Sequence, residues 1–284
     1  MNERLIQTDG IQICAESFGD PRDPALLLIM GAQSSLIWWE EPFCRRLAEG
    51  GRFVIRYDNR DVGRSTTYEP GNPDYTFEDM ADDAIRVLDA YQIEQAHIVG
   101  MSMGGMLAQM IALRHPRRTT SLTLVSTSNF AEHLPPMEEE VMAFFSKMGT
   151  IDWTSRQSVA EFAVQRSKVL AGSKHFFDRK KTSMLAELEF ARSANMASMG
   201  NHALLAGGES YLARTNEIGV PALIIHGTED PIIPYEHGKH LADIIPDAVL
   251  LALEGTGHEL PEGDWDQVVQ AILAHTATTP SDRR

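Results

Sequence analysis

Short apolar segments alternate with longer segments of helical periodicity over most of the chain. Seven apolar segments have the length of strands: 11–19, 25–31, 52–58, 96–101, 121–127, 221–227 and 248–255. Helical patterns lie between or after them, at 76–92 (with Thr76 as the expected cap), 102–115, 235–245 and 264–276. This alternation is typical of a mostly parallel sheet with helices on both faces, so the sequence predicts an α/β fold.

The alternation stops between residues 130 and 215. This stretch has no convincing strand, but methionine and phenylalanine recur at helix-like spacings: Met142, Phe144, Phe145, Met148, Phe162, Phe176, Phe177 and Met184. We interpret 130–215 as a helical cap that lies over the carboxyl edge of a core domain formed by 1–129 and 216–284. Most of these side chains are expected to pack the cap against the core. A minority should line an apolar substrate pocket, where Phe144, Phe145 and Gly31 are the candidate contacts.

Charge and cysteine content narrow the class of partner and the compartment. The net charge is −15, which argues against a nucleic-acid surface or an anionic membrane as partner. The only two cysteines, Cys14 and Cys44, suggest neither a disulfide framework nor a metal site, and the first residues lack the pattern of a signal peptide. We therefore expect a cytoplasmic protein without a bound metal.

A serine flanked by glycines stands where a predicted strand passes directly into a predicted helix. Residues 100–104 read Gly-Met-Ser-Met-Gly, with Ser102 at the centre. Small neighbours are needed where a strand turns so sharply into a helix that the two backbones nearly touch. Such a turn exposes the serine oxygen at the edge of the sheet and directs the backbone N–H of Met103 towards a developing oxyanion. The alternative is an ordinary serine cap at the start of the helix.

A serine nucleophile requires a base, and the base must be oriented by an acid. Loops after the last two predicted strands supply both: Asp230 follows "LIIHG", and His258 follows "LLALEG", 28 residues later. Glu229 is the other acid in the first loop, but the Asp-Pro step at Asp230 favours a fixed turn there. No other histidine has a comparable loop position at the carboxyl edge of the sheet.

The second oxyanion donor is expected in the loop after segment 25–31. That loop reads Met-Gly-Ala-Gln from Met30 to Gln33, and the N–H of Ala32 is the candidate. The alternative is an ordinary glycine turn.

With these residues in place, the sequence resembles the α/β-hydrolase family over nearly the whole chain outside the cap. It most resembles the aclacinomycin methylesterases of anthracycline tailoring pathways, through the stretches "DPALLLIMG", "VIRYDNRDVGRSTT", "GMSMGG" and "HGKHLADIIP". The resemblance implies the α/β-hydrolase fold with a helical cap. It also implies Ser102 as nucleophile, Asp230 as acid and His258 as base, with the N–H groups of Ala32 and Met103 as the oxyanion hole.

Two positions depart from the wider family. Met30 stands where many members have histidine, and Asp61 stands where many have glycine. The methylesterase group shares both departures, so they support the narrower resemblance without identifying the substrate.

Two arginines near Asp61 have two interpretations. Arg60 and Arg64 are expected to pin their loop by pairing with Asp58 and Asp61, as arginine forks commonly do. In the alternative, one of them binds a substrate carboxylate.

The sequence thus predicts a serine esterase that cleaves a bulky apolar small molecule through an acyl-enzyme, with no metal or organic cofactor. Lactone hydrolysis, hydrolysis of a carbon–carbon bond and cofactor-free perhydrolysis are alternatives that use the same three residues. A ligand-binding sensor with little turnover is the alternative from another class of protein.

Overall fold

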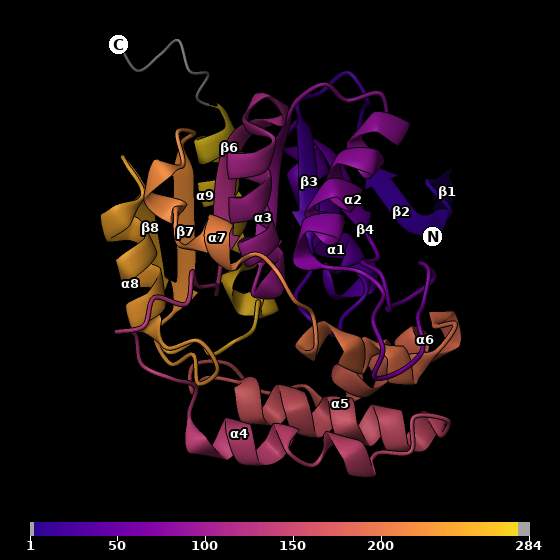
Figure 1. The fold of residues 1–284 in the computed structure, drawn as a ribbon. Helices are drawn as coiled ribbons and strands as arrows, with labels where there is room; N and C mark the ends of the chain where they lie inside the picture. Colours follow the sequence, from indigo (N-terminus) through magenta and orange to yellow (C-terminus); the bar gives the residue numbers. More distant parts are fainter. Residues whose placement is uncertain (1–2, 278–284) are drawn as a thin grey trace.

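The computed structural model describes residues 3–277, and its centre is one eight-stranded sheet (Figure 1). The strand order is β1-β2-β4-β3-β5-β6-β7-β8. The strands are β1 Arg4–Thr8, β2 Ile11–Phe18, β3 Ala25–Ile29, β4 Phe53–Tyr57, β5 Ala96–Met101, β6 Thr119–Val125, β7 Ala222–Gly227 and β8 Val249–Leu253. β2 pairs antiparallel with both β1 and β4, and all the other pairs are parallel. The predicted mostly parallel sheet is confirmed.

Strand β1 was not predicted because its sequence contains no apolar run. Only Ile6 of its five residues is buried, and the strand lies at the edge of the sheet, where one pairing partner is enough. The seven predicted strands all occur, with bounds that differ by up to two residues.

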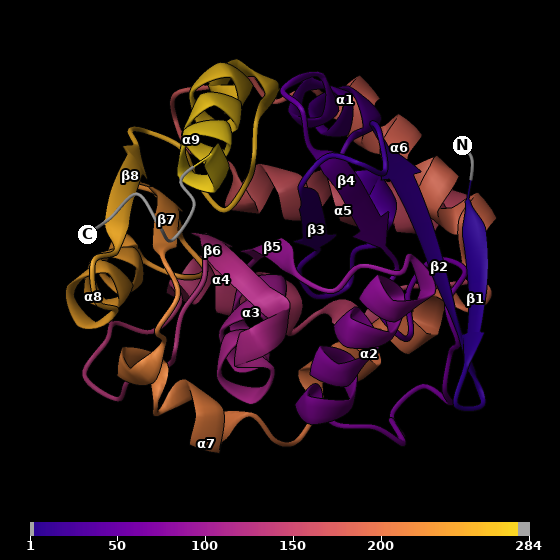
Figure 2. The same cartoon turned by 90° about the horizontal axis from the view of Figure 1, so that it is seen from above.

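Helices cover both faces of the sheet, as Figure 2 shows from above. The main helices are α1 Glu41–Glu49, α2 Phe77–Ala90, α3 Met103–Arg114, α8 Tyr235–Ile244 and α9 Trp265–Ala277. α1 and α9 pack on one face, and α2, α3 and α8 pack on the other. Alternate residues of β3 serve the two faces: Leu27 and Ile29 join the α2–α3 side of the core, and Leu26 and Leu28 join the α1–α9 side. The period of two in the side-chain direction along a strand produces this division.

Helix α2 begins at the expected cap. The Oγ1 atom of Thr76 accepts a hydrogen bond from the N–H of Asp79 (3.2 Å), and the Asp79 carboxylate accepts one from the N–H of Thr76 (2.8 Å). This reciprocal pair satisfies backbone donors that a helix N-terminus leaves without partners.

The chain between β6 and β7 is helical in the part that the structure describes. It contains α4 Glu139–Phe145, η3 Met148–Thr150, α5 Arg156–Leu170, α6 Arg179–Arg192, η4 Met196–Ala203, α7 Glu209–Leu212 and η5 Thr215–Glu217. The remaining short turns are η1 Leu36–Trp38, η2 Pro116–Arg118 and η6 Glu262–Asp264. α4, α5 and α6 lie together below one end of the sheet in Figure 1, whereas α7 lies back against α3. The division into cap and core at residues 130 and 215 stays a prediction.

The side chains that join the predicted cap to the predicted core differ from those expected. Phe176 is 95% exposed, Met184 63% and Met142 47%, so these three do not pack against the core. Instead, Val62 packs against a small apolar cluster of the predicted cap that includes Val159, Met196, Met199, Trp153 and Phe190. Helical spacing shows that residues share a face, but it does not show which face meets the sheet.

Within residues 3–277, no helix is both long enough and apolar enough to cross a membrane.

Candidate active site

Ser102 occupies a strained turn between β5 and α3. Its φ of 54° and ψ of −122° lie outside the helical and strand regions, and a residue with a side chain adopts such a conformation only when its surroundings enforce it. The enforcing bonds are on the backbone: Ser102 N donates to Val125 O (2.9 Å), and Ser102 O accepts from Thr127 Oγ1 (2.7 Å). The Ser102 side chain makes no capping hydrogen bond to α3. The hydroxyl is therefore not used as a helix cap.

The two glycines beside the serine are required by close backbone contacts. A Cβ atom on Gly100 would overlap the carbonyl of Gly104, and a Cβ atom on Gly104 would overlap the carbonyl oxygen of Ile29 in β3. Neither obstacle is a flexible side chain, so neither can move away cheaply.

Replacing Gly104 with alanine is therefore expected to destabilise the fold by roughly 1–3 kcal/mol or more, since the clash is with backbone. Gly219→Ala is the matched control, because a Cβ at Gly219 meets no atom within 4 Å. The midpoint of denaturant unfolding measures both variants. Equal midpoints for the two would show that β3 and α3 are not in close contact at this turn.

Asp230 and His258 form a buried hydrogen-bonded pair at the ends of β7 and β8. His258 Nδ1 lies 2.7 Å from Asp230 Oδ2, and the Asp230 side chain is fully buried. The other carboxylate oxygen, Oδ1, accepts from the N–H groups of Ile232 (3.0 Å) and Ile233 (2.8 Å). His258 N donates to Leu170 O at the end of α5 (2.8 Å), which ties the histidine loop to the predicted cap. Glu229, the competing acid, instead accepts hydrogen bonds from the N–H and the hydroxyl of Ser173.

A second histidine lies against the same carboxylate. Burial acts to raise the pKa of Asp230, but His258 and His226 outweigh it and hold that pKa below its usual value. His226 Nε2 donates to Ile233 O (2.7 Å) and lies 3.5 Å from Asp230 Oδ2. His226 lies within the predicted strand 221–227 and was not predicted to be a site residue. The available signal was its position four residues before the acid, at the end of the same strand.

The loop after β3 runs directly beside Ser102. A Cβ atom on Gly31 would lie 3.6 Å from Ser102 Oγ, so Gly31 leaves open the space beside that oxygen. No hydrogen bond within residues 3–277 uses the N–H of Ala32. Met103 is the first residue of α3, where an N–H has no acceptor within the helix. Neither of the two expected oxyanion donors thus has a hydrogen-bond acceptor among the described residues.

Neighbouring residues hold this loop in place. Asn59 Nδ2 donates to Met30 O (3.2 Å). Gln33, at a φ of 62°, donates its N–H to His202 Nδ1 (2.9 Å), and His202 Nε2 in turn donates to Arg60 O (2.7 Å). Burial lowers the pKa of His202, which favours the neutral ring that these two bonds require. His202 belongs to η4 and was not recognised from the sequence.

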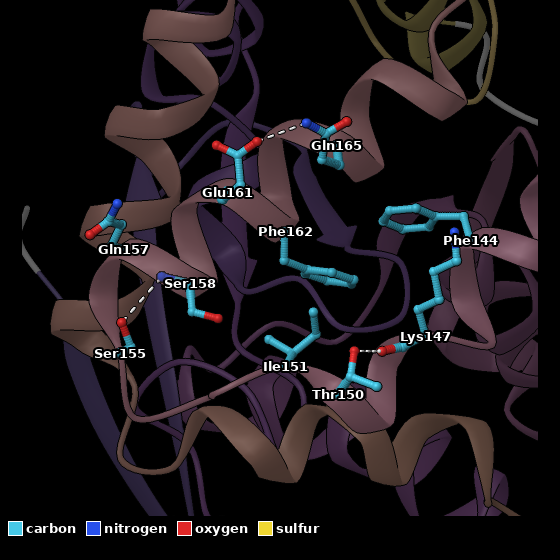
Figure 3. A pocket seen from close by; sticks show the side chains of 10 residues that line it. All are labelled: Phe144, Lys147, Thr150, Ile151, Ser155, Gln157, Ser158, Glu161, Phe162 and Gln165. Carbon is cyan, nitrogen blue, oxygen red and sulfur yellow. Dashed lines mark hydrogen bonds between the residues drawn. The ribbon is translucent and has the colours of Figure 1, made fainter.

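The two phenylalanines expected to contact substrate are in α4. Phe144 stacks on Phe162 of α5 with ring centroids 5.4 Å apart and touches Phe145 edge to face. Phe144 and Phe162 also line a cavity of about 490 Å³ between α4, η3 and α5 (Figure 3). Phe145 is not among the residues that line it.

The expected side-chain partners of Arg60 and Arg64 were wrong, although the backbone N–H of Arg64 does donate to Asp58 Oδ2 (2.8 Å). Arg60 forms a two-pronged bond with Asp83 of α2 (2.7 and 2.9 Å), and Arg64 pairs with Glu3 (2.6 Å). Asp58 pairs instead with Arg192 of α6, at 2.9 Å. These partners are distant in sequence, and local spacing gives no information about them. All three guanidinium nitrogens of Arg60 are bonded to Asp83 or Tyr68, so Arg60 is not free to bind a substrate carboxylate.

The sheet order, the strained serine turn and the buried Asp–His pair define an α/β hydrolase. Residues 24–263 match the model of the alpha/beta hydrolase fold family, and the chain belongs to that family. It is 32% identical to "Rhodomycin D methylesterase DauP" of Streptomyces sp. (strain C5) and 31% identical to "Rhodomycin D methylesterase DnrP" of Streptomyces peucetius. Both matches cover 97% of this chain and 98% of the relative. The resemblance to the methylesterases is confirmed.

A solved structure agrees on the fold alone. The esterase RhEst1 from Rhodococcus sp. ECU1013 superposes with a TM-score of 0.79 over 98% of this chain and 100% of its own, at 19% identity.

Proposed function

We propose that this protein is a carboxylic ester hydrolase that works through an acyl-enzyme on Ser102. The observation that carries the proposal is the buried bond of 2.7 Å between His258 Nδ1 and Asp230 Oδ2. It stands at the same sheet edge as a serine whose backbone is strained and whose hydroxyl is not used as a helix cap. A protein that only binds its ligand needs none of this machinery.

Each residue has a definite role in the proposed reaction. Because Nδ1 of His258 faces the carboxylate, its Nε2 is the nitrogen that takes the proton from Ser102 as the hydroxyl attacks the ester carbonyl. Asp230 holds the ring in this orientation and stabilises its positive charge. His258 then protonates the departing alcohol, and water attacks the acyl-enzyme by the same steps in reverse.

The N–H groups of Ala32 and Met103 are the proposed donors to the oxyanion. Losing one such donor typically costs roughly 100- to 1,000-fold in rate. Formation and hydrolysis of the acyl-enzyme both proceed by nucleophilic attack and proton transfer, so the proposed cycle requires no metal or organic cofactor.

The proposed substrate is a methyl ester of a bulky, largely apolar small molecule. Two relatives that match nearly the full chain are named as methylesterases. Aromatic rings of the predicted cap, Phe144 and Phe162, line a cavity whose size suits a small molecule, although none of Ser102, Asp230 and His258 lines it. We propose a cytoplasmic location, which suits Cys14 and Cys44, both buried and unpaired.

Hydrolysis of a panel of aromatic methyl esters tests the proposal. We expect methanol and the free acid to appear in equal amounts, with kcat/KM rising with the apolar bulk of the acid. Saturable ligand binding without release of methanol would instead support the sensor. Oxidation that depends on added peroxide would support perhydrolysis.

A further inference from the structure

An arginine of the predicted cap faces the loop that carries the proposed oxyanion donor. Arg166 lies on α5 and lines a small cavity together with Gln33, Trp38 and Glu189. Gln33 directly follows Ala32, and consecutive α-carbons are about 3.8 Å apart. The guanidinium therefore approaches the residue that follows the proposed oxyanion donor.

Few of the N–H groups of Arg166 have protein acceptors. The guanidinium lies over the ring of Trp38, 5.3 Å from its centroid, and one nitrogen approaches Gln33 O at 3.5 Å, the outer limit of a hydrogen bond. No carboxylate among residues 3–277 lies within 4.0 Å of it. Glu189, the nearest acid in the cavity, is already bound to Ser35 Oγ (2.7 Å) and Trp38 Nε1 (3.0 Å).

The arginines with buried side chains among residues 3–277 are satisfied, in contrast to the partly buried Arg166. Arg52, which also lacks a carboxylate partner, donates to Thr276 Oγ1 (2.8 Å), Gly51 O (2.9 Å) and Leu273 O (3.0 Å). Three more have carboxylate partners, in the pairs Arg56–Glu16, Arg60–Asp83 and Arg192–Asp58. The chain has 40 acidic residues against 25 lysines and arginines, so carboxylates are not scarce. An arginine left without a carboxylate partner beside the loop after β3 is available to a ligand.

Burial also weakens the hold of Arg166 on its proton. Burial lowers the pKa of the guanidinium, and the negative charge of Glu189 offsets this decrease only in part. A charged group in such a place gains more from an added anion than an exposed one does, because less water screens the interaction.

We propose that Arg166 anchors a carboxylate-binding subsite, which takes an ionised carboxylate that the substrate carries in addition to its ester. The inference rests on the proposed ester hydrolysis and adds a specificity-determining residue to it. The planar guanidinium matches a carboxylate in a two-pronged bond, and this pairing is stronger than a bond between neutral groups.

Phe162 separates this subsite from the larger cavity of the cap. It lines both the cavity in Figure 3 and the small one that contains Arg166. The small cavity measures about 10 Å³, which is room for about one water molecule. An entering carboxylate is larger than one water molecule, so the substrate would have to displace the Phe162 ring, which lines both cavities.

Matched pairs of esters test the subsite. We would measure kcat/KM for the monomethyl and dimethyl esters of adipate, terephthalate and naphthalene-2,6-dicarboxylate, above pH 6 where the free carboxyl group is ionised. The wild-type protein should prefer at least one ionised half-ester. Arg166→Met should lower kcat/KM for that half-ester by roughly 10- to 100-fold and change the matching dimethyl ester less than about 3-fold. Arg166→Lys should recover only part of the preference, because it keeps the charge without the fork.

Arg156→Met is the control, since Arg156 lies on the same helix and also stacks on an aromatic ring, that of Phe190. It should leave both rates unchanged. If Arg166→Met lowers kcat/KM equally for the half-ester and the dimethyl ester, Arg166 has a structural role and the inference is overturned. The inference is also overturned if the wild-type protein prefers none of the ionised half-esters over its dimethyl ester. Calorimetric titration with the three dicarboxylates keeps the two proposals apart: binding that depends on Arg166, without hydrolysis of any ester, would reject the esterase and retain the subsite.

Discussion

Replacing Ser102 with alanine should lower kcat on any ester substrate by roughly 10⁴- to 10⁶-fold, because removing the nucleophile of such a triad removes the acyl-enzyme route entirely. The fold should survive the change. The Ser102 hydroxyl makes no capping bond, and the bonds that hold the turn are on the backbone, to Val125 and Thr127.

Covalent labelling makes this result independent of the choice of substrate. A fluorophosphonate probe should add one adduct to the native protein, seen as a single mass shift, and none to Ser102→Ala. Ser146→Ala is the control, since Ser146 is an exposed serine just after α4 whose hydroxyl donates only to Ala143 O, three residues earlier. An adduct that persists in Ser102→Ala would place the reactive nucleophile elsewhere. A folded native protein that takes no label would contradict the acyl-enzyme mechanism.

The Asp–His pair could be predicted because parallel strands order the chain in space. Asp230 and His258 each follow a predicted strand, and the carboxyl ends of neighbouring parallel strands meet at one edge of the sheet. Loops after adjacent strands are therefore neighbours even when many residues separate them. The structure brings the two side chains into hydrogen-bond contact without any long-range signal in the sequence.

Residues that act through contacts across the fold could not be found in this way. His202 and Arg166 both reach Gln33 from the predicted cap, and the position of a helix over the sheet edge depends on which of its faces is buried. The prediction of the partners of Arg60 and Arg64 failed for a related reason. Carboxylates close in sequence were chosen, whereas the ones close in space belong to α2 and to the N-terminal segment.

Changing Asp230 to asparagine should lower kcat by about 10⁴-fold while leaving KM nearly unchanged, because an amide no longer fixes the His258 tautomer or stabilises its charge. Glu229→Gln is the matched control one residue away. Its carboxylate binds Ser173 on the surface and should have little influence on the rate. A comparable loss in both variants would point to a disturbed loop rather than to a role for the acid.

The same substitution should also change how stability depends on pH. The folded-state pKa of Asp230 lies below that of an unfolded aspartate, so its ionised form stabilises the fold fully above about pH 4 and loses this contribution as the pH falls further. Asparagine does not titrate. We therefore expect the variant to be less stable than the wild type at pH 6, by an amount on the order of 2 kcal/mol, and the gap to narrow at pH 3. Urea unfolding at both values measures the gap. A gap that is constant or widens towards pH 3 would mean that His258 and His226 do not stabilise the Asp230 carboxylate in the folded protein.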